Sequence, residues 1–172
     1  MRKREKVRLR ILVSITCVAI TSACADATDA VSVRGYNHMR NLSIHTFTVN
    51  GIMGPNARPG TGGGETCCVS IPRQWRPGLK AKVAWEYDQK EDVASPLPEN
   101  QTAEVDIPQY RDVGAMHVHF YDGHNIKIVI SNCSPRHPFY PMSPADLAPW
   151  QSSGTKEDAR EAAQRGGGSV DC

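Results

Sequence analysis

The sequence lacks the motifs by which several classes of enzyme are recognised. It has no GxSxG nucleophile elbow and no HExxH helix motif, so it does not look like a lipase or a zincin. The glycines at 60–64 are followed by Glu65-Thr66 instead of Gly-Lys-Ser/Thr, which disfavours a Walker phosphate loop. No CxxC spacing supports a zinc site. We therefore expect a protein that is not an enzyme and has no metal or other cofactor.

The sequence also lacks an apolar run long enough to cross a bilayer. The run Ile11–Ala23 has 13 residues, whereas a transmembrane helix needs about 20. It follows a segment with six Lys/Arg and one Glu, and it ends on the small residues Thr21-Ser22-Ala23 before Cys24. A basic segment, a short apolar core and small residues predict a signal peptide over residues 1–23.

The end of this segment resembles the lipobox of bacterial lipoproteins, although Thr21 stands where Leu is preferred. The resemblance implies cleavage before Cys24, with diacylglycerol on its thiol and an acyl chain such as palmitate on its freed amine. Several acyl chains would anchor the protein stably to a lipid bilayer, with residues 24–30 as a tether. Ala25 favours the outer membrane. The alternatives are an ordinary secretory signal cut near Ala23 or Ala25, or an uncleaved anchor.

Removal of residues 1–23 reverses the sign of the net charge. The full chain carries 20 Lys+Arg and 18 Asp+Glu, whereas the remaining 149 residues carry 14 and 17. The basic residues are scattered, so nothing indicates a nucleic-acid partner. This length suits one domain with a sizeable core.

The body of the chain predicts a mainly β fold. Short runs rich in β-branched and aromatic residues are separated by turns, which indicates a single antiparallel β-sandwich-like domain over residues 31–142 with long Gly/Pro loops. The clearest alternation places one set of residues inward: Leu79, Ala81, Val83, Trp85 and Tyr87. The other predicted strands are Val31–Asn37, Leu42–Asn50, the strand after Gly64, Gln101–Ile107, Met116–Tyr121 and Asn125–Asn132.

Local signals add detail to this β domain. A change of parity predicts a bulge near His45-Thr46, and Asp122-Gly123-His124 indicates a hairpin turn. Trp75, held between prolines, is expected to anchor the core. Residues 143–172 are predicted to be a low-order tail in which Lys156–Gln164 forms at most a short, polar helix.

Four cysteines remain after cleavage and acylation: Cys67, Cys68, Cys133 and Cys172. An exported protein meets an oxidising compartment, so at least one disulfide is expected. Cys67 shares strand parity with Val69 and should face the core. Cys133 is the favoured partner for Cys67 or Cys68, but the sequence leaves the pairing open.

Several blocks together are similar to a family of bacterial lipoproteins catalogued as domain of unknown function 3304. They lie in order over residues 31–141: VRGYNH (33–38), TVNG (48–51), GGGETCCVSIPRQWRPGL (62–79), VAWEY (83–87), IPQY (107–110), MHVHFYDGHNIKIVISN (116–132) and HPFYP (137–141). Cys133 falls where members often carry another residue. The resemblance implies a periplasmic immunity protein that binds and neutralises the phospholipase effector of a type VI secretion system.

Two other functions stay open: a metal-binding or enzymatic lipoprotein that uses histidines, and a structural envelope lipoprotein. His117 and His119 alternate on one predicted strand face, which we interpret as solvated or half-buried. Partner contacts are expected on the loops 51–64 and 134–142, because loops on a rigid scaffold commonly carry recognition. The candidate contact residues in the second loop are His137, Phe139 and Tyr140.

Overall fold

The computed structural model describes residues 27–89, 96–150 and 154–165. The predicted signal peptide, Cys24 and Cys172 lie outside these residues. The elements in chain order are β1 (Thr28–Asn37), β2 (Leu42–Val49), β3 (Ile52–Met53), β4 (Gly62–Pro72), β5 (Lys80–Gln89), β6 (Gln101–Asp106), β7 (Ala115–Tyr121), η1 (Asp122–His124), β8 (Asn125–Ser131), α1 (Pro144–Leu147) and α2 (Lys156–Gln164). The mainly β fold is therefore confirmed.

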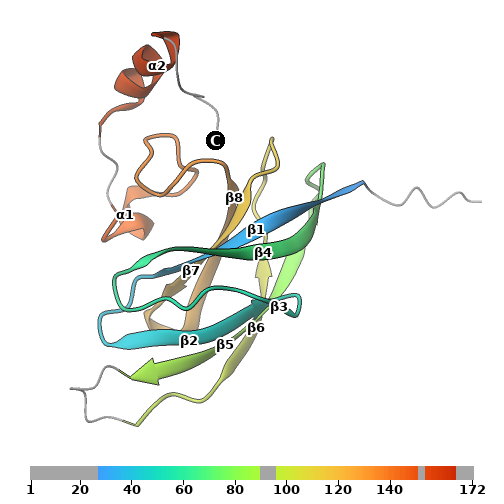
Figure 1. Cartoon of the computed structure of the whole chain (residues 1–172), viewed down its shortest axis with the longest axis vertical. Helices are drawn as coiled ribbons and strands as arrows, with labels where there is room; N and C mark the ends of the chain where they lie inside the picture. The colour runs from blue at the N-terminus through green and yellow to red at the C-terminus, as the bar shows by residue number, and fades with distance from the viewer. Residues whose placement is uncertain (1–26, 90–95, 151–153, 166–172) are drawn as a thin grey trace, which may run out of the picture.

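The strands form two four-stranded sheets that pack face to face (Figure 1). The first sheet has the order β4-β1-β7-β8 and the second has the order β3-β2-β5-β6. One pairing departs from the antiparallel expectation, since β1 and β7 run parallel. The whole second sheet is inserted between these two strands in the sequence, and this long crossover permits a parallel neighbour.

The core lies between the two sheets. In β5, Ala81, Val83, Trp85 and Tyr87 are all buried, so the predicted inward face is confirmed. Trp75 is only partly buried; it packs against the edge of the core, and its indole N–H donates to the Ile107 carbonyl at 2.8 Å. It is thus a peripheral anchor, not a central core residue.

The predicted bulge and hairpin both form. In the β2–β5 pairing the register shifts between Ile44 and Thr46, which leaves His45 as the extra residue. η1 connects β7 to β8 with Gly123 at a positive φ of 72°. Asn50 and Gly51, at φ 50° and 84°, form the left-handed turn between β2 and β3.

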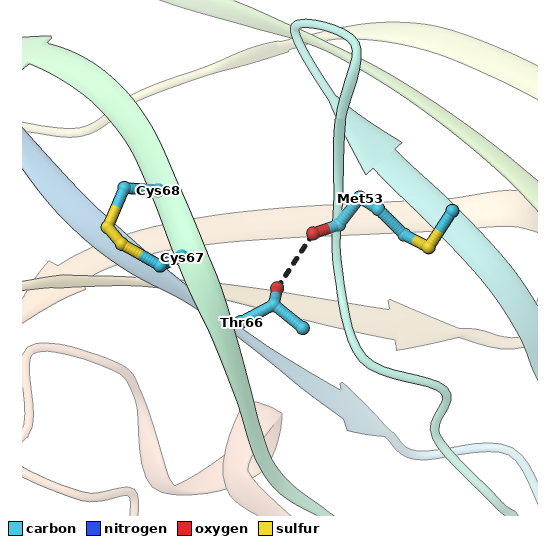
Figure 2. The surroundings of a disulfide bond; sticks show 4 residues. All are labelled: Met53, Thr66, Cys67 and Cys68. Carbon is cyan, nitrogen blue, oxygen red and sulfur yellow. Dashed lines mark hydrogen bonds between the residues drawn. A yellow bond between two sulfur atoms is a disulfide. The ribbon is translucent and has the colours of Figure 1, made fainter.

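A second bulge overturns the prediction for the cysteines. Val69 pairs with Val31 and Thr66 pairs with Val33, so Cys67 and Cys68 together stand opposite the single residue between those valines. The alternation breaks there, and Cys67 is exposed instead of facing the core. The two cysteines form a disulfide with each other, on the side of β4 away from Met53 (Figure 2). The expected bond from either to Cys133 is therefore wrong.

The chain after β8 folds back along the outer face of the first sheet (Figure 1). We call residues 134–150 the C-terminal strap. Leu147 and Trp150 are buried, so packed structure continues past residue 142. In α2, Thr155 and Asp158 form a capping box, which explains why this polar segment is helical. Within the described ranges, no helix has the length and apolar character needed to cross a membrane.

Candidate functional site

Three histidines and a tyrosine meet beneath the C-terminal strap. His38 follows β1, His117 and His119 point outward from β7, and Tyr140 comes from the strap. His117 and His119 are both 0% exposed. The expectation of a solvated or half-buried face is therefore wrong, because the strap covers the outer side of β7 while the core covers its inner side.

Hydrogen bonds join these four side chains into one continuous chain, which we call the histidine array. His38 Nε2 lies 2.9 Å from His119 Nδ1. His119 Nε2 lies 2.7 Å from the Tyr140 hydroxyl, and the same hydroxyl lies 2.9 Å from His117 Nδ1. At the other end His38 Nδ1 contacts the carbonyl oxygen of Ala148 in the strap.

That carbonyl sets the direction of every bond when the three imidazoles are neutral. A carbonyl only accepts, so His38 must carry its proton on Nδ1 and leave Nε2 as an acceptor. His119 Nδ1–H then donates to His38 Nε2, and Tyr140 O–H donates to the bare His119 Nε2. His117 Nδ1–H donates to the Tyr140 oxygen. All three histidines are therefore Nδ1–H tautomers.

The array ends at one nitrogen that has no partner. His117 Nε2 is buried and makes no hydrogen bond, whereas most buried polar atoms in proteins are paired. Burial, together with the positive charge of Arg34, lowers the pKa of the His117 imidazole to about 3. Burial also lowers the pKa of His119 well below its usual value and lowers that of His38. All three rings are neutral at pH 7.

Aromatic rings enclose the array. Tyr36 stacks on His119 with ring centroids 4.8 Å apart, and Tyr121 stacks on His38 at 4.1 Å. Trp150 meets the rings of Tyr36 and His38 edge-on at 5.3 and 4.7 Å. These rings help to keep water from His117 and His119 and cover part of His38, which favours the neutral form of the imidazoles.

Two ion pairs flank the array, and each consists of one positive and one negative side chain. Arg34 on β1 bonds Glu65 on β4 at 2.8 Å, close to His117. Lys127 on β8 bonds Asp146 in α1 at 2.6 Å, on the side of His38 and His119. Each carboxylate favours a positive charge on the nearby imidazoles and each cation disfavours it, but burial is the largest influence on the imidazole pKa values and lowers all three.

The geometry does not favour a metal centre here. Among the described residues, no group of three His, Cys, Asp or Glu side chains is arranged to hold a metal ion. His117 Nδ1 and His119 Nε2 both bond the Tyr140 hydroxyl, so these nitrogens are not free to ligate. The array instead holds the strap on the sheet, with Tyr140 and Ala148 as the two points of attachment.

The predicted contact residues of the strap have different surroundings. Tyr140 is 5% exposed and belongs to the array, so its predicted role at a partner surface is wrong for this conformation. Its hydroxyl bonds two histidines beneath the strap instead of facing solvent. His137 and Phe139 are half-buried, and the Phe139 ring lies under the cationic side chains of Lys156 and Arg160 from α2.

Sequence reasoning missed Tyr36, Trp150 and the link between His38 and β7. The sequence did carry a signal for part of the histidine array, since the blocks VRGYNH, MHVHFYDGH and HPFYP each contribute side chains to it. Asn37 has a structural role: its side-chain amide donates to the backbone carbonyls of Leu42 and Ala57 at 2.7 and 3.0 Å.

A second feature lies at the far edge of the second sheet. Ile52 is 38% exposed and Met53 is 65% exposed, on the hairpin within the predicted contact loop 51–64. The Thr66 hydroxyl donates to the Met53 carbonyl at 2.7 Å (Figure 2), and the Gly54 amide donates to the Phe47 carbonyl at 2.8 Å. The hairpin is thus held in place while it presents two large apolar side chains to solvent.

Comparison with known families agrees with the motifs. The family described as Protein of unknown function (DUF3304) matches residues 36–128, which is more than half of the chain. Neither a curated protein nor a solved structure matches. The matched region includes His38, His117 and His119 and ends before Tyr140.

Proposed function

The chain belongs to the DUF3304 family of proteins of unknown function, and on this premise we propose that it is a binding protein anchored in the cell envelope. Its proposed role is immunity: acylated Cys24 holds it on the periplasmic side of the outer membrane, where it occludes a phospholipase toxin. The signal sequence and the resemblance of the motifs support this location and partner. The exposed hairpin of Ile52 and Met53 is the observation that carries the binding function.

The hairpin has the properties of a recognition element. Its backbone is held in place without a partner. The Asn50 backbone N–H donates to the Lys82 carbonyl, and the Asn50 side-chain oxygen accepts from the Lys82 backbone N–H. Such preorganisation lowers the entropic cost of association. A phospholipase must accept acyl chains, so the mouth of its active site is apolar, and the side chains of Ile52 and Met53 complement such a surface. Methionine also adapts its shape to an irregular pocket.

The histidine array supports binding over catalysis. A catalytic base has to reach its substrate, whereas His117 and His119 are 0% exposed and bonded to Tyr140. The same bonds disfavour the metal-binding alternative. We place the partner surface on the hairpin and assign the array to the fold.

The experiment is co-expression with a candidate phospholipase effector of a type VI secretion system, directed to the periplasm of a sensitive host. Survival with this protein and binding of the purified pair at nanomolar concentration, about −12 kcal/mol, are the expected results. Unchanged survival together with no binding at micromolar concentration would refute the immunity function for that pair.

Two variants then test the hairpin. Met53→Glu places a charge in the contact and should weaken binding by more than tenfold. Leu97→Glu is the matched control, because Leu97 is also a large exposed apolar residue, at 47%, but lies outside the hairpin. Equal affinities for the two variants would place the contact surface elsewhere.

A further inference from the structure

We propose that the histidine array is a proton-sensitive latch: it holds the C-terminal strap while its imidazoles are neutral and releases the strap when they take up protons. Two features of the array support this latch: the number of protons that it can hold, and the lack of a hydrogen-bond partner for His117 Nε2. It does not depend on the proposed immunity function.

The neutral array holds as many protons as it has hydrogen bonds. Four bonds link Ala148, His38, His119, Tyr140 and His117. Three neutral imidazoles and one hydroxyl supply four protons, one for each bond. Every heteroatom of the array is then used once or more, except His117 Nε2.

A fifth proton therefore always leaves a hydrogen on His117 Nε2. If it stays there, His117 becomes a buried cation. Alternatively, each proton of the array moves one bond along and the charge reaches His38. His119 and His117 then become Nε2–H tautomers, and the Nε2–H of His117 still has no acceptor. Both states place the unpaired Nε2–H donor of His117 in the interior, which proteins avoid, and the first state places a charge there as well. The array cannot hold more than five protons, because each of its four hydrogen bonds holds one and His117 Nε2 holds the fifth.

The groups around the array do not relieve this. Arg34 and Glu65 face His117 from β1 and β4, and they are already paired with each other. Lys127 of β8 and Asp146 of α1 are also paired with each other; Asp146 raises the pKa of His38 and His119 and Lys127 lowers it, but burial outweighs both. The remaining titratable neighbours are the tyrosines of β1 and β7, Tyr36 and Tyr121, which are neutral.

Opening the strap removes the restriction. Tyr140 and Ala148 leave with the strap, and the three imidazoles meet water and titrate near the ordinary value of about 6.5. The closed state thus binds fewer protons than the open state between pH 6.5 and the lowered pKa values of the array. The opening equilibrium should rise by up to about tenfold per pH unit for each histidine as the pH falls through this window.

The test is amide hydrogen exchange of the protein purified with its lipid anchor in detergent, from pH 8 to pH 4.5. Protection factors, corrected for intrinsic exchange, should fall in the strap below about pH 6.5 while β2 and β5 stay protected. His117→Asn keeps a side-chain N–H for Tyr140 but cannot be protonated. It should reduce the pH dependence of strap opening by up to about tenfold per pH unit.

His45→Asn is the matched control, because His45 is exposed and outside the array; it should behave as the wild type. The latch is wrong if strap and sheets lose protection together, or if His117→Asn and His45→Asn give the same pH dependence. Nitrogen NMR of the wild type provides a test that needs no variant. It should find His38, His117 and His119 as neutral Nδ1–H tautomers at pH 7.5, and an Nε2–H tautomer at His117 would overturn the proposal.

Discussion

Replacing Tyr140 by Phe tests the histidine array with the smallest change of shape. The ring remains and only the hydroxyl is lost, which donates to His119 and accepts from His117. Two buried ring nitrogens then have no partner within hydrogen-bond reach. Each unpaired buried polar group costs about 1–3 kcal/mol, so for two of them we expect the free energy of unfolding to fall by about 2–6 kcal/mol. A typical domain is stable by only about 5–15 kcal/mol.

The measurement is urea unfolding followed by circular dichroism at pH 8, where the imidazoles are neutral in both states. Tyr110→Phe is the matched control, because the Tyr110 ring is also buried and its hydroxyl donates only to the Pro72 carbonyl. Losing that one bond should cost about 0.5–1.5 kcal/mol. The denaturant slope should stay unchanged in both variants, since the surface exposed on unfolding is the same.

A loss in Tyr140→Phe no larger than in Tyr110→Phe would refute this reasoning. It would mean that His117 and His119 find other partners, and the direction of bonding derived from Ala148 would then have no support. An unchanged stability in Tyr140→Phe with a large loss in Tyr110→Phe would contradict it further, because the ranking of the two sites would be reversed.

Three further predictions concern the core, the cysteine pair and the anchor. Trp85→Ala should destabilise the fold by about 3–5 kcal/mol, and Trp75→Ala by less because Trp75 is only partly buried; equal changes in melting midpoint would contradict this order. Alkylation without reduction should leave Cys67 and Cys68 unmodified, and prior reduction should add two labels to their common peptide. Cys24→Ser should move the protein from membrane to soluble fractions, and an unmodified wild-type Cys24 in mass spectrometry would exclude the anchor.

The sequence predicts those strands that have one buried and one solvated face. β5 is the example, because Lys82 and Glu86 alternate with Val83 and Trp85, and the alternation reports directly which face is covered. The bulge at His45 was also predictable, since the apolar parity changes there. In each case the information lies within a few residues of the element itself.

Where the prediction fails, the cause lies far away in the sequence. His117 and His119 have the polarity of a solvated face, and only the strap, 21 or more residues later, shows that they are buried. His38 and His119 are 81 residues apart, and no periodicity links them. The inward position of Cys67 fails for a different reason: the bulge belongs to the pairing of β4 with β1, and β4 alone does not reveal it.

A polar attachment explains why the strap takes one position. An apolar face would accept Leu147 and Met142 in several registers, because apolar contacts are not directional. The array accepts only the register that places the Tyr140 hydroxyl between His117 and His119. Any shift of the strap leaves these buried nitrogens unpaired, which costs more than the hydrogen bonds contribute. The same requirement makes the attachment depend on the protonation state, so the precision of the strap and its sensitivity to acid arise from the same four side chains.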